Sequence, residues 1–150
     1  PWHEDRHARL FVREAFSLSI LLALEDSPTD NCTVFVPGSH PLTVSEKEDY
    51  YGITAARLAG GNVRYAGEIA ARFREPLPLQ AGETVLFHPG LLHASSGFVN
   101  RREPESSERT SITFRVTTPG VELRDAAFPE EREHRDLVLR TLRRASGTIG

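Results

Sequence analysis

The stretch AFSLSILLALEDSPTDNCTVFVPGSH, residues 15–40, decides the fold. Residues 15–26 first alternate between polar and apolar side chains and then become continuously apolar, a pattern typical of a buried β-strand. The turn-rich cluster DSPTDN ends this strand. CTVFVPGSH, residues 32–40, predicts a second short strand that is broken at Pro37-Gly38. Two strands joined by a short polar turn predict an antiparallel hairpin.

The rest of the chain continues the β pattern and adds helices. EPLPLQAGETVLFHPG, residues 75–90, predicts an edge strand with two prolines, then a turn and a core strand at TVLF. RTSITFRVTT, residues 109–118, alternates well and predicts the last strand. Residues 45–73 contain helix formers cut by glycines, which predicts short helices or a structured excursion over the sheet. Residues 91–108 predict a loop.

The tail, residues 129–145, predicts a C-terminal helix, because its acidic residues come early, its arginines come late and a glycine follows. Several short strands with these helices predict a mainly β protein, an antiparallel β-sandwich or jelly roll. A length of 150 residues suits a single domain over residues 1–150. The chain has no Met and begins abruptly, so we expect the C-terminal part of a longer protein that lacks its N-terminal portion.

Composition narrows the classes of function. The net charge of −3 argues against a general nucleic-acid surface. No apolar run is long enough to span a bilayer, and no signal peptide is present, so a membrane partner is not expected. The single cysteine, Cys32, excludes an internal disulfide and a CxxC metal site. These features predict a cytoplasmic protein.

His3 and Asp5 are the first candidates for chemistry. In an extended segment, side chains at i and i+2 point to the same side, so this imidazole and carboxylate can converge on one ion. GETVLFHPGLLHASS supplies two distant histidines, His88 and His93, that could complete the set. Two histidines and one carboxylate form a facial triad on iron with open positions, and a tetrahedral zinc site is the competing interpretation.

Several motifs in a fixed order point to one family. WHED, PGSH, GETVLFHPG, HAS and ERTSITFR follow one another from residue 2 to about residue 118. Together they resemble the phytanoyl-CoA dioxygenase (PhyH) family of Fe(II)/2-oxoglutarate-dependent oxygenases. The resemblance implies a cupin-like double-stranded β-helix, which is a jelly roll. It also implies Fe(II), 2-oxoglutarate and O2 as cofactor and co-substrates.

The resemblance assigns roles to five residues. It implies that His3, Asp5 and His93 are the catalytic iron ligands, with His93 favoured over His88. It implies that Arg109 and Ser95 bind the far carboxylate of 2-oxoglutarate. Arginine suits this task because its planar guanidinium binds a carboxylate through two hydrogen bonds and keeps its charge. Arg115 is the competitor, because six residues separate it from Arg109 and both would face the same side of a regular strand.

The implied reaction is the hydroxylation or oxidation of a C–H bond of a small organic molecule, with succinate and CO2 as co-products. Asp5 is present where family halogenases carry a small residue, which favours hydroxylation over halogenation. Two alternatives are a non-catalytic or degenerate jelly-roll binding module and a cupin-like zinc hydrolase or isomerase. The sequence assigns no substrate and no oligomeric state, and it leaves Trp2, Glu4, His7 and His40 between structural and pocket-lining roles.

Overall fold

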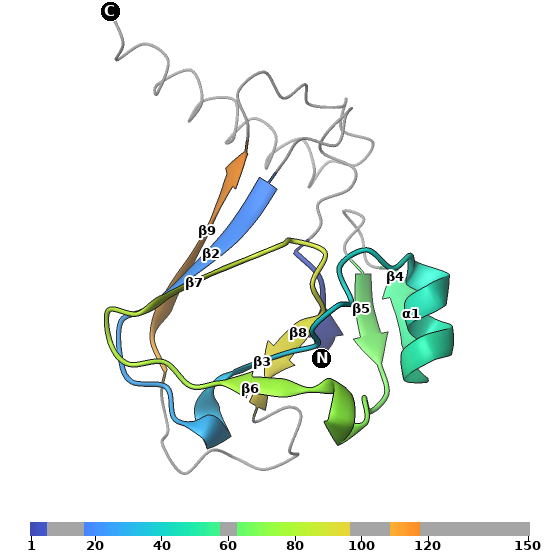
Figure 1. Ribbon diagram of the computed structural model, residues 1–150, viewed down its shortest axis with the longest axis horizontal. Helices are drawn as coiled ribbons and strands as arrows, with labels where there is room; N and C mark the ends of the chain where they lie inside the picture. The colour runs from blue at the N-terminus through green and yellow to red at the C-terminus, as the bar shows by residue number, and fades with distance from the viewer. Residues whose placement is uncertain (6–16, 58–62, 97–108, 118–150) are drawn as a thin grey trace, which may run out of the picture.

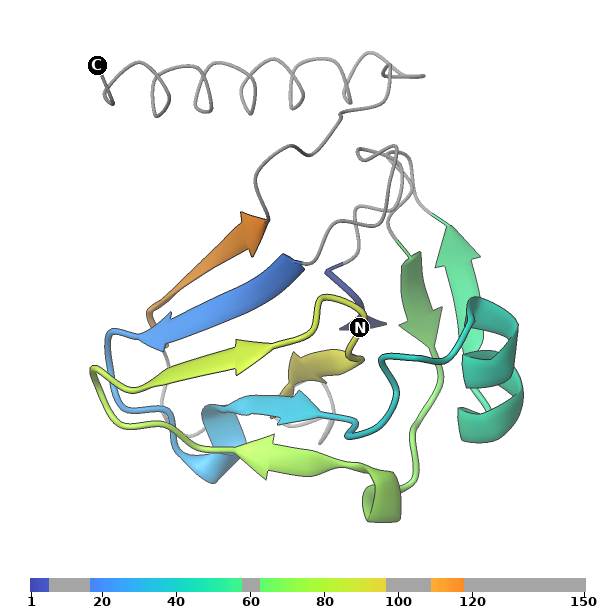
Figure 2. The same cartoon turned by 45° about the horizontal axis from the view of Figure 1, so that its top comes forward.

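The computed structural model describes residues 1–5, 17–57, 63–96 and 109–117. Their strands form two antiparallel sheets, one of six strands and one of three, which lie on opposite sides of the molecule in Figures 1 and 2. This architecture confirms the predicted mainly β, jelly-roll fold class. The predicted C-terminal helix at 129–145 lies outside the described residues.

The larger sheet has the order β4-β5-β1-β8-β3-β6. Its strands are β1 (Trp2–His3), β3 (Thr33–Phe35), β4 (Thr54–Arg57), β5 (Val63–Ala66), β6 (Glu75–Leu77) and β8 (His93–Ser95). β1 is only two residues long, yet it lies in the middle of this sheet between β5 and β8. β6 is an edge strand, as its prolines predict.

The smaller sheet has β2 (Ser17–Ala23) at its centre. β2 pairs along its whole length with β9 (Ser111–Thr117) and, on its other edge, with β7 (Thr84–Phe87). Both long strands were predicted from their alternation. β7 was predicted as a core strand, but it is an edge strand and its Leu86 is 58% exposed, so only one of its faces is buried.

The predicted antiparallel hairpin of residues 15–26 with residues 32–40 is wrong. β2 and β3 belong to different sheets, and the chain between them crosses from one sheet to the other through the short helix η1 (Thr29–Asn31). A bridge between Ser27 and Leu79 holds this crossing. The physical reason is that each strand already has partners on both edges, β7 and β9 for β2 and β6 and β8 for β3. Those partners come from distant sequence, which local patterns do not reveal.

The excursion at 45–73 is partly helical. α1 (Val44–Tyr51) begins with a capping box in which Thr43 and Glu46 bond each other's backbone N–H groups, and it ends at Gly52, whose φ is 67°. The short helix η3 (Ala71–Phe73) lies near its end. The strands β4 and β5 between them were not predicted, because each is only four residues long and lies in a segment of helix formers and glycines, and both are stabilised by pairing within the larger sheet. β8 likewise falls in a segment that was predicted as loop.

The larger sheet is buried on both faces around β1, β3 and β8, whereas β4, β5 and β6 carry exposed side chains. On its outer face, α1 and the following chain cover a core that includes Trp2, Tyr51, Tyr65, Ile69 and Leu92. On its inner face, Phe35 packs with Leu21 of β2 and Phe87 of β7, which joins the two sheets. Side chains of β1, β3 and β8 therefore alternate between the outer core and the space between the sheets.

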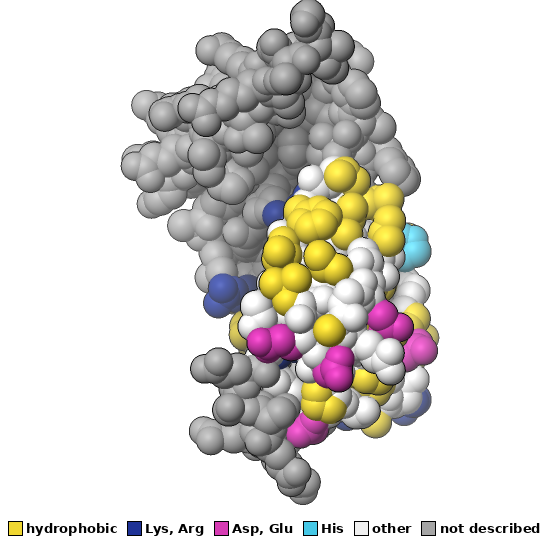
Figure 3. Space-filling model, turned by 90° about the vertical axis from the view of Figure 1, so that its left-hand side faces the viewer, with side chains coloured by type: hydrophobic (Ala, Val, Ile, Leu, Met, Phe, Trp, Pro, Cys, Tyr) yellow, Lys and Arg dark blue, Asp and Glu magenta, His cyan; other side chains and the backbone are white. Residues whose placement is uncertain are grey.

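The smaller sheet differs, because its outer face carries exposed apolar side chains. Figure 3 shows a patch of hydrophobic side chains on this side of the molecule. The exposed large residues of this sheet are Leu86, Ile112, Phe114 and Val116. Among the described residues, no helix is long and apolar enough to cross a membrane.

Candidate metal centre

The first two predicted ligands come from β1 and the residues just after it. His3 lies opposite His93 in the antiparallel pair of β1 with β8, which places both side chains on one face of the sheet. The centroids of their rings are 4.2 Å apart. Asp5 follows two residues later, and its backbone N–H donates to the carbonyl oxygen of Pro89 at 2.8 Å. Strand pairing thus brings together residues that are ninety positions apart in sequence.

His3, Asp5 and His93 form a cluster that could hold a metal ion. One ligand atom from each lies within 4.8 Å of the others. Nε2 of His93 is 3.8 Å from Oδ1 of Asp5. Asp5 and His93 are 8% and 7% exposed, so the ion would have little competition from bulk water at these two ligands. The roles of the three residues as ligands stay a prediction.

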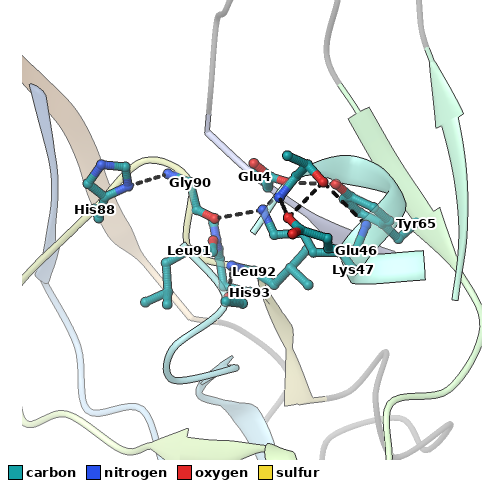
Figure 4. Close-up of polar contacts among 11 residues, drawn as sticks. Glu4, Glu46, Lys47, Tyr65, His88, Gly90, Leu91, Leu92 and His93 are labelled. Atoms are coloured by element: carbon teal, nitrogen blue, oxygen red, sulfur yellow. Dashed lines mark hydrogen bonds and ion pairs between the residues drawn. The ribbon is translucent and has the colours of Figure 1, made fainter. Parts of the chain in front are cut away.

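His88 lies apart from this cluster and has a different role. Its Nδ1 accepts the backbone N–H of Gly90 at 3.0 Å, and its carbonyl oxygen accepts the N–H of Leu91 at 2.9 Å (Figure 4). Its ring lies 5.1 Å from that of His40. His88 therefore shapes the turn that leads into β8, and His93 is the histidine that the structure brings to His3 and Asp5.

Asp5 is held through both of its carboxylate oxygens. The hydroxyl of Ser19 donates to Oδ2 at 2.8 Å, and Nη2 of Arg115 lies 2.8 Å from Oδ1. Ser19 and Arg115 face each other across β2 and β9, so both reach Asp5 from the inner face of the smaller sheet. Burial by itself raises the pKa of Asp5, but His93, Ser19 and Arg115 together hold that pKa below its ordinary value. The carboxylate is ionised at neutral pH.

His93 is oriented by its backbone and by aromatic rings. Its Nδ1 lies 2.9 Å from the carbonyl oxygen of Leu91, which can only accept, so Nδ1–H donates and Nε2 carries the lone pair. The rings of Phe35 and Phe87 lie 5.8 Å and 5.1 Å from the His93 ring. Burial, together with the nearby His3, lowers the pKa of His93. The nitrogen that faces Asp5 is thus unprotonated at neutral pH, as metal ligation requires.

Arg109 and Ser95 lie near one another on the inner face of the larger sheet. Nη1 of Arg109 is 3.3 Å from both the Thr33 hydroxyl and the Asn31 carbonyl oxygen. Thr33 is paired directly with Ser95 across β3 and β8, so their side chains share a face. Ser95 is two residues from His93 and therefore lies on the same side as the metal cluster. Arg115 is instead engaged with Asp5.

Sequence reasoning missed the residues that support the ligands. Ser19 and Arg115 contact Asp5, and the alternation of β2 and β9 puts both on one face, but their pairing partner could not be read from the sequence. Lys47 was also missed, although it is the only lysine in the chain, and it forms an ion pair with Glu4. Two undecided residues now have a place: Trp2 is a core residue of the outer face, and Glu4 is the partner of Lys47. His7 lies outside the described residues.

The donor set suits iron. Two imidazoles and one carboxylate on one side of an ion form the 2-His-1-carboxylate set of non-haem Fe(II) oxygenases, which leaves positions open for other ligands.

A comparison with models of protein families agrees with this chemistry. A search among curated proteins gave no match to the chain. The sequence model of the family described as Phytanoyl-CoA dioxygenase (PhyH) matches residues 1–102, which include all three members of the cluster. Members of this family are typically oxygenases. The match covers more than half of the chain, and the chain therefore belongs to the phytanoyl-CoA dioxygenase family.

Proposed function

We propose that this chain is the catalytic core of an Fe(II)- and 2-oxoglutarate-dependent dioxygenase that hydroxylates or oxidises a C–H bond of a small organic molecule. The observation that carries the proposal is the cluster of His3, Asp5 and His93 at the inner face of the larger sheet. Bound iron would supply the activation of O2, with 2-oxoglutarate as co-substrate and succinate and CO2 as co-products. The family membership supports the same class of reaction.

Some residues of the site would bind the ion or orient its ligands, and others would exclude water. His3, Asp5 and His93 would hold the ion from one side and leave the opposite side open. Ser19 fixes the direction of the Asp5 carboxylate, and the backbone of Leu91 fixes the ring of His93. Phe35 and Phe87 pack against His93 and keep water from that side of the site.

Arg109 would bind the far carboxylate of 2-oxoglutarate, with help from Ser95. The hydrogen bonds that Arg109 makes to described residues go to neutral oxygens of Asn31 and Thr33, so its positive charge is available to an anion. Arg115 is the weaker candidate, because its guanidinium already neutralises the charge of Asp5. The geometry thus favours the arginine that the family resemblance implies.

We also propose that the enzyme acts in the cytoplasm on a small molecule, without nucleic-acid or membrane partners. Its single cysteine is fully buried as a free thiol, which suits a reducing compartment. The net charge of −3 argues against a general nucleic-acid surface.

The test is spectroscopic and needs no substrate. Fe(II) and then 2-oxoglutarate are added to the protein without oxygen, and a visible charge-transfer band is expected when the co-substrate chelates the metal. The band should be absent in Asp5→Ala and in His93→Gln, and it should require more 2-oxoglutarate in Arg109→Gln. His88→Gln is the matched control, because His88 lies on the same turn as His93 but outside the cluster. It should keep the band.

Two outcomes would overturn the proposal. One is the absence of any band in the unaltered protein at saturating Fe(II) and 2-oxoglutarate. The other is tight zinc binding that 2-oxoglutarate does not affect, which would favour the zinc hydrolase or isomerase. A band that survives in His93→Gln but not in His88→Gln would instead exchange the roles of the two histidines.

A further inference from the structure

We propose that Lys47 is a positioning residue for the metal centre, because its ammonium group joins the two chain segments that carry the ligands. This inference rests on the proposed function, in which His3, Asp5 and His93 bind a metal ion. The first segment is residues 3–5, and the second is the turn 88–92 that leads into His93. Lys47 touches neither ion nor ligand, so it acts through the backbone of its neighbours.

The first contact is an ion pair with Glu4, the residue between the two N-terminal ligands. Glu4 points to the opposite side from His3 and Asp5, where Nζ of Lys47 lies 2.8 Å from its Oε1 (Figure 4). The hydroxyl of Tyr65 donates to the same oxygen. The side chains of Lys47 and Glu4 are 1% and 5% exposed. The residue in the middle of the His-x-Asp motif is thus anchored in the interior.

The second contact is with the turn before β8. Nζ of Lys47 also donates to the carbonyl oxygen of Gly90 at 3.3 Å. The neighbouring carbonyl of Pro89 accepts the backbone N–H of Asp5 at 2.8 Å, so the two segments already lie side by side. Figure 4 shows Lys47 between Glu4 and Gly90, with Leu91, Leu92 and His93 following in the same turn. One cation therefore contacts both segments next to the backbone hydrogen bond that joins them.

The helix that carries Lys47 is itself fixed at both ends. Its first turn is closed by the capping box of Thr43 and Glu46, and its last residue, Tyr51, is buried in the outer core. α1 can therefore serve as a rigid support from which Lys47 reaches the metal segments. The only lysine of the chain is placed where it contributes nothing to surface charge.

Stability alone does not account for this arrangement. A buried ion pair is commonly no more stabilising than apolar side chains of similar size, because both charges lose their hydration. What the ion pair adds over an apolar pair is direction: the ammonium must meet a carboxylate on one segment and a carbonyl on the other. Groups that orient metal ligands typically change metal affinity by about 10–100-fold when they are removed.

The experiment replaces the pair and separates metal affinity from stability. In the double variant Glu4→Gln/Lys47→Met, both charges of the pair are removed and the amide oxygen at position 4 can still accept from the Tyr65 hydroxyl, so the protein should fold with only a moderate loss of stability. Co(II) is the probe, measured by calorimetry and by its visible d–d spectrum, which reports coordination geometry. We expect the affinity to fall about 10–100-fold with a changed spectrum. A folded double variant with unchanged affinity and spectrum would overturn the proposal.

Two further variants make the result specific. Ser27→Ala removes a buried hydroxyl that accepts the N–H of Leu79, far from both ligand segments, so it should lower stability and leave Co(II) affinity unchanged. His93→Gln should lose Co(II) binding. If the unaltered protein does not bind Co(II), or binds it equally well without His93, the proposed function fails rather than the role of Lys47.

A second measurement uses the unaltered protein and does not depend on a variant that folds. Acylation of Lys47 and alkylation of Cys32, which is equally buried and whose thiol donates to the carbonyl oxygen of Thr29 outside the ligand segments, are followed by mass spectrometry. If Lys47 ties those segments together, saturating Co(II) should slow its acylation several-fold more than it slows the alkylation of Cys32. Equal protection of the two residues would count against the proposal.

Discussion

At the scale of single residues, the carboxylate of Asp5 has one protein partner on each of its two oxygens. Ser19 donates to one oxygen and Arg115 to the other, so a cation that enters the cluster must share or displace one of them. Ser19 is fully buried and cannot move far, whereas the side chain of Arg115 is 35% exposed. Arg115 is therefore the partner that a divalent ion competes with for Oδ1.

The substitution Arg115→Gln should tighten the binding of divalent metal, because it removes a positive charge next to the ion. Exposed ion pairs contribute about 0.2–1 kcal/mol, so we expect an increase in Co(II) affinity of up to about fivefold, which shrinks at high salt. Arg109→Gln is the control and should leave Co(II) affinity unchanged in the absence of 2-oxoglutarate. Weaker binding in Arg115→Gln would mean that the arginine orients Asp5 rather than competing with the metal.

His93 should make the stability of the metal-free protein depend on pH. Burial and His3 lower its pKa below the ordinary value of 6.5, so the folded protein binds fewer protons than the unfolded chain as the pH falls through this range. The free energy of unfolding should therefore decrease as pH drops below about 6.5 and level off once His93 is protonated in the folded state.

Denaturant unfolding between pH 7.5 and 5 measures this effect. In His93→Gln the decrease should be smaller, since the group with the lowered pKa is gone. Asp5 does not interfere, because its pKa lies below the ordinary value of 3.8 and its contribution is lost only at more acid pH. The same slope in both proteins would show that His93 is not responsible.

At the scale of secondary-structure elements, strands with a clear pattern in their own sequence could be predicted. The strands with which they pair could not. The alternation of β2 and β9 and the prolines of β6 identified these strands correctly. β4 and β5 are too short, at four residues each, for such a pattern to identify them, and the hairpin of β2 with β3 was wrong because pairing is decided by distant strands. The candidate ligand His93 was singled out from its motif, although the strand β8 that carries it was not predicted.

The cap of α1 offers a test at this scale. Thr43 accepts the backbone N–H of Glu46, so Thr43→Ala should lower the free energy of unfolding by about 0.5–2 kcal/mol. Thr54→Ala, on the exposed side of β4, is the matched control and should change stability less. The measurement is denaturant unfolding of both variants, and equal effects would argue that the cap adds nothing to the fold.

At the scale of the whole molecule, the two sheets are covered unequally. The central strands of the larger sheet are packed on both faces, whereas the outer face of the smaller sheet leaves Leu86, Ile112, Phe114 and Val116 between 44% and 58% exposed. Contiguous apolar surface of this kind binds apolar dyes and promotes association. It faces away from Ser19 and Arg115, which point to the metal cluster from the same strands.

The double variant Leu86→Thr/Phe114→Thr should reduce the binding of a fluorescent apolar dye and any concentration-dependent association. Because both side chains are exposed in β-strands that accept threonine, stability should change by no more than about 0.5 kcal/mol for each. Light scattering and dye fluorescence measure the effect, with Co(II) affinity as the control for an intact metal centre. Unchanged dye binding would place the apolar surface elsewhere.

The central position of β1 also dictates the order in which the protein can be completed. Trp2 and His3 leave the ribosome before almost every other described residue, but their place between β5 and β8 does not exist until the chain has been made past Ser95. The N-terminal strand must wait while about ninety residues are synthesised, and such non-local pairing is slow to form. The cluster of His3, Asp5 and His93 is therefore completed late in folding.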